Sequence, residues 1–311
     1  MDIYVSIVTP TYNRAGTLAR LFDSLVNQTN LNFEWIVSDD GSEDGTRELI
    51  NKLISISPFK IQYLYKDNGG PHTARNLAIQ NSNGQFIFFV DSDDILLPNA
   101  ISRGIEIWDS LGDDRINYWA VYGRGRYSGG ELVGELLPDR FNLFPKAKKR
   151  YLWRTKYKFD GIAIARADIL KENPWPEPEG LKFIVESMLY NELHVKYECL
   201  YVNDVFMVYY QDQHDHLTQS SVSWESSFSS YIYYLDLSNR IFKMDKTFKL
   251  HEKFKYQCKL LYTAYKLGKS SRDIYHDVTN RITGIYLMAV YPLFCLIWKA
   301  MRLKQLENQG N

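Results

Sequence analysis

The sequence predicts an α/β fold, in which a mostly parallel central sheet has helices on both faces and is followed by a C-terminal helical extension. In the first half of the chain, short apolar segments typical of strands alternate with segments of helical spacing. One of the apolar segments, residues 86–90, is uniformly apolar, which is typical of a strand buried on both faces. Each predicted strand of this half ends at polar or glycine residues. Strands that alternate with helices are joined by right-handed crossovers and form a mostly parallel sheet.

The predicted elements follow in order along the chain. Strands are predicted at residues 4–8, 33–38, 61–65 and 86–90, then at 118–122, 161–165 and 202–209. Helical spacing marks residues 18–25, 49–54, 74–78 and 183–194, and Pro71 and Pro98 suit the first turns of helices. Residues 173–180 are rich in proline and form a loop. After Ser223, helical stretches are predicted at 224–243, 247–267 and 271–304, so we divide the chain into an α/β domain, 1–220, and a helical region, 221–311.

Composition excludes some classes of protein. Lys and Arg number 37, as do Asp and Glu, and this absence of net charge argues against a general nucleic-acid-binding protein. The three cysteines lie far apart without metal-site spacing, which indicates a reducing compartment without a disulfide or zinc framework. No basic segment precedes the first apolar run, so we expect no signal peptide and a cytoplasmic protein.

Acidic residues follow the apolar run at 86–90 directly, in the order Asp91, Ser92, Asp93 and Asp94. Open α/β sheets bind ligands at the carboxyl ends of their strands, which is where this cluster lies. Carboxylates crowded in this way repel one another and favour a bound cation. A solvated turn with an Asp at a helix N-cap is the alternative interpretation of such a motif taken alone.

Four polar motifs occur in order, each at a predicted strand end. They are Thr9-Pro10-Thr11-Tyr12-Asn13-Arg14, Asp39-Asp40-Gly41-Ser42, Asn68-Gly69-Gly70 with Arg75-Asn76, and Asp91-Ser92-Asp93-Asp94. This ordered set resembles the inverting family 2 glycosyltransferases, which have the nucleotide-sugar-binding GT-A fold. The resemblance covers about residues 1–218, and the set is specific although each motif alone is weak.

The resemblance implies a donor site, and the chemistry of the residues agrees with it. A nucleobase requires a flat partner and a hydrogen-bond acceptor, and Tyr12 with Asp39 or Asp40 offers both. Arg75 is expected to reach the base or the phosphates, with a surface arginine as the alternative. Gly69 and Gly70 allow close approach of a ligand or simply form a turn. The remaining donor-binding candidates from the motifs are Thr9, Pro10, Arg14, Asp91 and Ser92.

The resemblance also implies a divalent cation. It assigns Asp91 to the ribose and to the metal, and Asp93 to the metal, for which Mn²⁺ or Mg²⁺ suits hard oxygen ligands shared with phosphates. Family members often have a histidine near the metal at the position of His214 and His216, so both are candidate ligands, with exposed loop residues as the alternative.

Glu186 is the candidate catalytic base, since inversion by single displacement requires one base on the acceptor side of the sugar. Many relatives have Glu-Asp here, with the Asp as base, whereas this chain has Val185-Glu186. A charge interaction with the helix N-terminus is the alternative role.

These residues together predict a hexosyltransferase-type enzyme. The donor is a nucleoside-diphosphate sugar, with UDP favoured, and the acceptor is a saccharide or lipid-linked saccharide in surface polysaccharide or glycolipid assembly. Two alternatives are a phosphatase with Asp as nucleophile, which carries its acidic motif on the first strand, and a non-catalytic nucleotide-sugar-binding or scaffold protein on the same fold.

Two segments indicate contact with a membrane surface. Residues 146–158 combine seven basic residues with aromatic ones, which suits anionic lipid or a solvated face. Residues 282–298 contain no charged residue, and the predicted apolar helix extends over 282–304. We expect this helix to lie in the cytoplasmic face of a membrane, with a buried core helix and a full span as the alternatives.

Overall fold

The computed structural model describes residues 4–137, 161–210, 224–244 and 248–309. The basic segment 146–158 and the candidate ligands His214 and His216 lie outside these residues. The chain forms two compact units, Met1–His216 and Leu217–Asn311.

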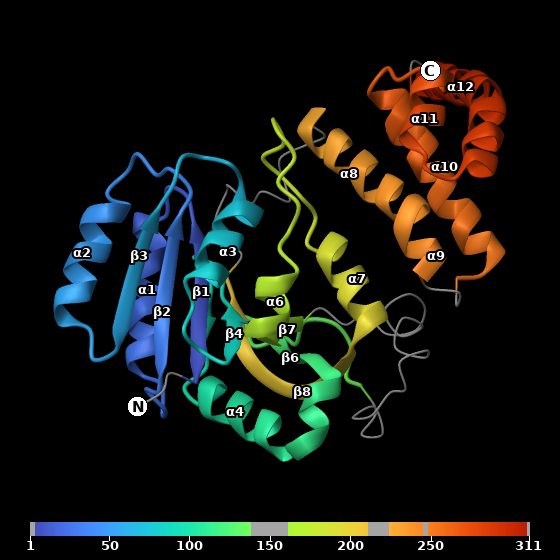
Figure 1. The fold of residues 1–311 in the computed structure, drawn as a ribbon. Coiled ribbons are helices and arrows are strands. Elements are labelled where there is room, and N and C mark those ends of the chain that lie inside the picture. Colours follow the sequence, from blue (N-terminus) through green and yellow to red (C-terminus); the bar gives the residue numbers. More distant parts are fainter. Residues whose placement is uncertain (1–3, 138–160, 211–223, 245–247, 310–311) are drawn as a thin grey trace. The chain divides into compact units, whose positions relative to one another are not determined.

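The N-terminal unit is built on one eight-stranded sheet in the order β3-β2-β1-β4-β7-β6-β8-β5 (Figure 1). The strands are β1 (Val5–Thr11), β2 (Phe33–Asp39), β3 (Lys60–Tyr65), β4 (Phe86–Phe89), β5 (Ile95–Leu96), β6 (Tyr118–Tyr127), β7 (Gly161–Arg166) and β8 (Glu198–Tyr209). The strands β3, β2, β1 and β4, which are neighbours in this order, are parallel to one another, and β6 is parallel to β8. Only β7 and β5 run antiparallel to their neighbours, so the predicted mostly parallel sheet is confirmed.

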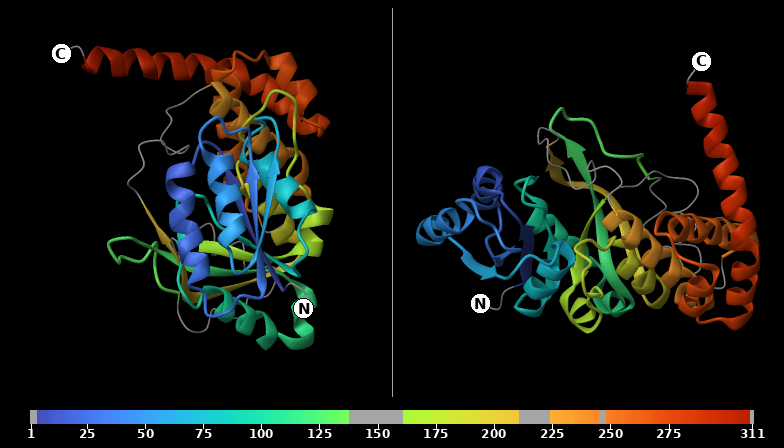
Figure 2. Two further views of the ribbon diagram at one scale, coloured as in Figure 1. Left: turned by 90° about the vertical axis from the view of Figure 1, so that its left-hand side faces the viewer. Right: turned by 90° about the horizontal axis from the view of Figure 1, so that it is seen from above.

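Helices cover both faces of this sheet (Figure 2). They are α1 (Ala15–Val26), α2 (Thr46–Ile56), α3 (Pro71–Gln80), α4 (Ala100–Ser110), α6 (Ala167–Glu172) and α7 (Ser187–Lys196), with a 3₁₀ helix at Gly112–Asn117. All residues of β1, β2 and β4 are buried, which is the burial that their apolar sequences predict.

A buried carboxylate on β2 forms hydrogen bonds with residues of β1 and β3. Glu34 on β2 has no exposed surface and accepts hydrogen bonds from Ser6 Oγ at 2.8 Å, Lys60 Nζ at 2.8 Å and the backbone N–H of Asn83 at 2.6 Å. Burial alone would raise the pKa of Glu34, but these hydrogen bonds outweigh burial and hold that pKa below its usual range. The sheet therefore contains a charged residue that is stabilised by its partners.

The structure differs from the sequence-based expectations at three points. The helix predicted over 183–194 begins at Ser187. The segment before it is irregular, but its buried Leu181 and Ile184 lie three residues apart, which resembles helical spacing. The stretch 271–304 is two helices, since the side chain of Asn280 accepts a hydrogen bond from the N–H of Thr283 and so begins a new one. The short strand β5 was not predicted from its two residues.

The described part of the C-terminal unit is helical. It contains α8 (Trp224–Asp236), a π-helical turn (Leu237–Ile241), α9 (Phe242–Met244), α10 (Leu250–Lys266), α11 (Ser271–Asp277) and α12 (Arg281–Gln309). Leu260, Leu261, Ile274, Leu287 and Tyr291 form the centre of its core.

Candidate active site

The residues of the four sequence motifs lie at one edge of the sheet, where β1, β2 and β4 end. Parallel pairing of β1 with β2 places Thr11 opposite Asp39, and β4 lies on the other side of β1. The N-terminus of α3 follows β3 at the same edge. The fold therefore brings all four sequence motifs to the ligand-binding edge of an α/β sheet.

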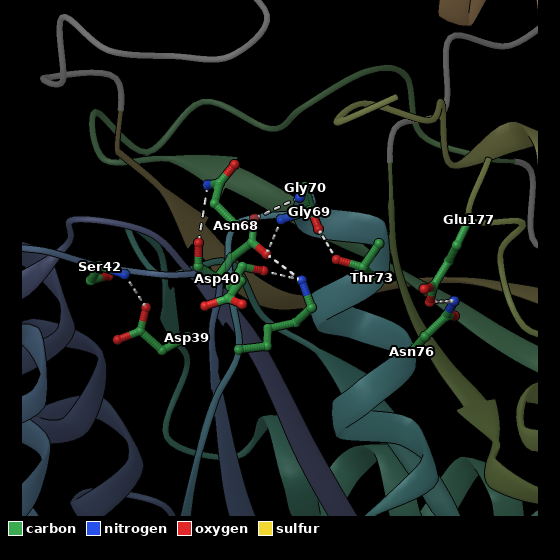
Figure 3. Close-up of polar contacts among 11 residues, drawn as sticks. Asp39, Asp40, Ser42, Asn68, Gly69, Gly70, Thr73, Asn76 and Glu177 are labelled. Atoms are coloured by element: carbon green, nitrogen blue, oxygen red, sulfur yellow. Dashed lines mark hydrogen bonds and ion pairs between the residues drawn. The ribbon is translucent and has the colours of Figure 1, made fainter. Parts of the chain in front are cut away.

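Asp40 holds the loop that leads into α3. Its carboxylate accepts hydrogen bonds from the backbone N–H groups of Gly69 at 2.9 Å and Gly70 at 2.7 Å and forms an ion pair with Lys66 at 2.9 Å (Figure 3). Its carbonyl accepts a further hydrogen bond from the side chain of Asn68 at 3.0 Å. Asp40 is 3% exposed, and both its carboxylate oxygens are used within the protein.

Gly70 is required by its backbone and by its neighbours. Its φ angle is +98°, and an added Cβ would lie 1.8 Å from the carbonyl oxygen of Lys182. Only glycine combines this conformation with such close approach of another segment. That segment leads to Glu186, so the glycine motif packs directly against the residues that precede Glu186.

Asp39 is buried and oriented by two hydrogen bonds. It accepts from the N–H of Ser42 at 2.8 Å and from the hydroxyl of Tyr63 at 2.5 Å. Burial and then this carboxylate raise the pKa of Tyr63 to about 12. The neighbouring loop is fixed by Asn13, whose N–H donates to Ser42 Oγ at 2.8 Å.

Arg75 forms ion pairs with two of the predicted site residues. This arginine, on α3, is almost fully buried and forms ion pairs with Asp91 at 3.1 Å and with Glu186 at 2.6 Å. Burial would lower the pKa of Arg75, but Glu186 and Asp91 outweigh it, so the pKa rises and the guanidinium stays charged. Asp91 and Glu186 are about half exposed, so each carboxylate also faces solvent.

The acidic cluster after β4 brings three aspartates close together. Asp94 is 5% exposed, and burial followed by repulsion from Asp91 and Asp93 raises its pKa to about 8. The side chain of Arg20 donates to the backbone carbonyl of Asp93 at 2.6 Å, which orders the turn. A divalent cation beside Asp91 and Asp93 would relieve this repulsion, so the residues present fit such an ion.

Within the described residues, no group of three or more His, Cys, Asp or Glu side chains is arranged to hold a metal ion by itself.

Asn76, next to Arg75 on α3, fixes the proline-rich loop of residues 173–180. Its side chain donates to the carboxylate of Glu177 at 2.7 Å (Figure 3). It also donates to the carbonyl of Trp175 at 2.8 Å and accepts from the N–H of Trp175 at 3.0 Å. Asn76 belongs to one of the sequence motifs, but a single sequence does not indicate these distant partners.

The remaining donor-binding candidates occupy different environments. Tyr12 is 47% exposed at the rim, as a stacking partner requires. Thr9 is fully buried and its hydroxyl accepts a hydrogen bond from the indole N–H of Trp35 at 3.0 Å, so that hydroxyl lies within the core. Pro10 and Ser92 are buried, and the backbone N–H of Arg14 donates to Thr46 Oγ1 at 3.3 Å.

A family model described as "Glycosyl transferase family 2" matches residues 6–173. An uncharacterized glycosyltransferase of Rickettsia bellii is 34% identical over 152 residues, which are 47% of this chain and 22% of that protein. The poly(ribitol-phosphate) beta-N-acetylglucosaminyltransferase TarS of Staphylococcus aureus is 27% identical over 226 residues, 71% of this chain and 38% of that protein. The matched segments therefore span less than half of these relatives.

Solved structures show the same fold at lower identity. The structure of S. aureus TarS 1–349 with UDP-GlcNAc has a TM-score of 0.61 at 18% identity, covering 96% of this chain and 92% of that one. A mannosyltransferase from Pyrobaculum calidifontis, in complex with GDP-Man and Mn²⁺, has a TM-score of 0.54 at 14% identity, covering 94% and 86%. These similarities establish the GT-A fold expected from the sequence.

Proposed function

Because this chain belongs to glycosyltransferase family 2, we propose that it transfers one sugar from a nucleoside-diphosphate sugar to a hydroxyl acceptor with inversion, by metal-assisted single displacement. UDP-sugars are the favoured donors, since the TarS structure that shares this fold holds UDP-GlcNAc. The acceptor is a saccharide or a lipid-linked saccharide.

The observation that carries this proposal is the ion-paired bridge formed by Arg75. One buried guanidinium contacts Asp91, at the donor edge, and Glu186, the candidate base. Inversion needs a base held on the side of the sugar opposite the departing diphosphate. A rigid link between the donor edge and the base supports that geometry, because the position of Glu186 then depends on the donor site itself.

Each residue has a distinct task in the proposed reaction. Tyr12 stacks on the nucleobase, Asp39 accepts its ring N–H, and Asp91 binds the ribose. Asp40 maintains the shape of the loop that faces the diphosphate. Glu186 removes the proton of the acceptor hydroxyl as that oxygen attacks the anomeric carbon.

Asp93 and Asp91 would hold Mn²⁺ or Mg²⁺, which neutralises charge on the leaving diphosphate when it is bound. The close approach of Asp91, Asp93 and Asp94 supports a cation here, since burial and then repulsion from Asp91 and Asp93 raise the pKa of Asp94. The P. calidifontis enzyme with GDP-Man and Mn²⁺ is a further support from the same fold.

The first test is a thermal-shift screen of nucleoside diphosphates and their sugars with Mn²⁺. A ligand at about 100 times its Kd stabilises by about 2.7 kcal/mol, which for an N-terminal unit of this size raises the Tm by about 5–11 °C. A screen in which no nucleotide or nucleotide sugar raises the Tm would refute the proposed donor class.

The second test separates an enzyme from a non-catalytic binding protein. The stabilising nucleotide sugar is incubated with the protein and Mn²⁺, and release of nucleoside diphosphate is measured. Glu186→Gln should retain the thermal shift but lower turnover by about 10²–10⁴-fold. Glu192→Gln is the matched control, because Glu192 lies on α7, the helix that directly follows Glu186, and pairs with Lys196. Turnover in Glu186→Gln within a few-fold of the control would place the base elsewhere.

A further inference from the structure

Between Arg281 and Lys299, the outward face of helix α12 is apolar. The Arg281–Lys299 part is long and apolar enough to cross a membrane by length and composition, with a mean hydropathy of 1.6. Between its two charged ends, the exposed side chains recur every three or four residues and none is charged. They are Ile282, Ile285, Tyr286, Ala289, Pro292, Leu293, Leu296 and Ile297.

The opposite face of α12 is packed on its own unit. Leu287 and Tyr291 are buried in the core, and the hydroxyl of Tyr291 donates to the carbonyl of Lys269 at 3.0 Å. Gly284 lets Tyr275 of α11 approach, since an added Cβ would lie 3.2 Å from that ring. The helix is thus held by α10 and α11, and a full span would break these contacts.

An exposed apolar stripe of this length is unusual for a soluble surface. Helices on the surface of globular proteins place polar residues outward, whereas here Ile282 is 82% exposed and Leu296 is 65% exposed. Continuous apolar patches on proteins mark contact with another protein or with a membrane. The occupant must therefore be identified from the surroundings of the stripe.

Charge distinguishes between these occupants. The C-terminal unit contains 14 Lys and Arg against 7 Asp and Glu, a net charge of +7, whereas the N-terminal unit contains 23 against 30, a net charge of −7. Two copies that met through this stripe would bring two positively charged units together. An anionic lipid surface matches both the apolar stripe and the positive charge, including Arg281 and Lys299 at its ends.

We propose that the outer face of α12 docks on anionic lipid, with the helix lying in the plane of the membrane. The apolar stripe enters the boundary between headgroups and acyl chains, and the basic residues of the unit contact lipid phosphates. This inference depends on the surface of the C-terminal unit alone and does not rest on glycosyl transfer.

Flotation of the full chain with lipid vesicles tests the proposal. The protein should float with vesicles that contain phosphatidylglycerol, should float weakly with phosphatidylcholine alone, and should detach as salt rises. The double variant Leu293→Glu with Leu296→Glu should lower the bound fraction at least about tenfold, because binding scales with the apolar area that enters the interface. The matched control is Ile54→Glu with Ile56→Glu, two exposed isoleucines on α2.

A second variant keeps the test independent of the apolar substitutions. Arg281→Gln with Lys299→Gln leaves the stripe intact and should weaken binding to anionic vesicles selectively, with unchanged circular dichroism. Equal flotation of all variants, or none for the wild type, would overturn the proposal. So would a lipid-free dimer that the Leu293 and Leu296 substitutions dissociate, which would assign the stripe to a second copy. Resistance to extraction by alkaline carbonate would assign it to a span.

Discussion

The contact between Asn76 and the proline-rich loop gives the sharpest prediction. Replacing Asn76 with alanine leaves the buried backbone N–H and C=O of Trp175 without their hydrogen-bond partners. An unsatisfied buried polar group costs about 1–3 kcal/mol, so the two together cost about 2–6 kcal/mol if the loop stays in place. For a unit of this size the Tm should fall by about 4–24 °C.

The loop can instead detach from α3 and expose those groups to water, which costs less free energy than leaving them buried without partners. In that case the Tm changes less, but the segment leading to Glu186 is no longer held against α3. Detachment of the loop lowers turnover, whereas the affinity for nucleotide depends on other residues and should stay within a few-fold. The assay therefore combines thermal unfolding, nucleotide binding and donor turnover.

Asn81→Ala is the matched control. Asn81 follows the same helix and is exposed, and its side chain donates to the carbonyl of Leu77 at 2.8 Å, within one turn of α3. If Asn76→Ala matched this control in both Tm and turnover, the role of Asn76 in positioning the proline-rich loop would be refuted.

Three further predictions concern the core, the glycine turn and the metal. Glu34→Gln should cost about 1.5–3 kcal/mol of unfolding free energy at neutral pH; because the folded pKa of Glu34 is lowered from 4.5, that difference should shrink as the pH falls below this value, as denaturant titrations at several pH values will show. Gly70→Ala should cost at least the roughly 1–3 kcal/mol of a strained backbone and lower the Tm, whereas Gly129→Ala, where an added Cβ meets nothing within 4 Å, should be neutral. Asp93→Asn should lower Mn²⁺-dependent affinity for a UDP-sugar by at least the roughly 10–100-fold that loss of a supporting residue costs, and equal calorimetric affinity with and without Mn²⁺ in the wild type would contradict this.

Much of the fold was predictable because its central strands are buried on both faces. The apolar runs of β1, β2 and β4 and the helical spacing between them follow directly from that burial. Sequence reasoning failed where burial is irregular, as at Leu181 and Ile184, whose spacing imitates a helix. It also gave no sign of Glu34, because a charged residue in a buried strand is stabilised by partners distant in the sequence.

The site was predictable one motif at a time, but its connections were not. The polar strand ends identify the edge of the sheet at which a ligand binds. The hydrogen bond between Asn76 and Glu177 joins residues 101 positions apart, and only the folded chain brings them together. The same holds for Arg75 with Glu186 and for Gly70 with Lys182. The assignment of His214 and His216 as metal ligands stays a prediction.

Helix α3 connects the edge of the sheet where β1, β2 and β4 end with the segment that leads to Glu186. Gly70, directly before the helix, donates its N–H to Asp40 and leaves room for the Lys182 carbonyl. One turn later, Arg75 forms ion pairs with Asp91 and Glu186, and Asn76 contacts the proline-rich loop. Because a helix is rigid over this length, we expect a shift at this edge of the sheet to move Glu186 through a single element. We therefore expect changes in α3 to alter turnover more strongly than nucleotide affinity, which is the behaviour of residues that position a reaction.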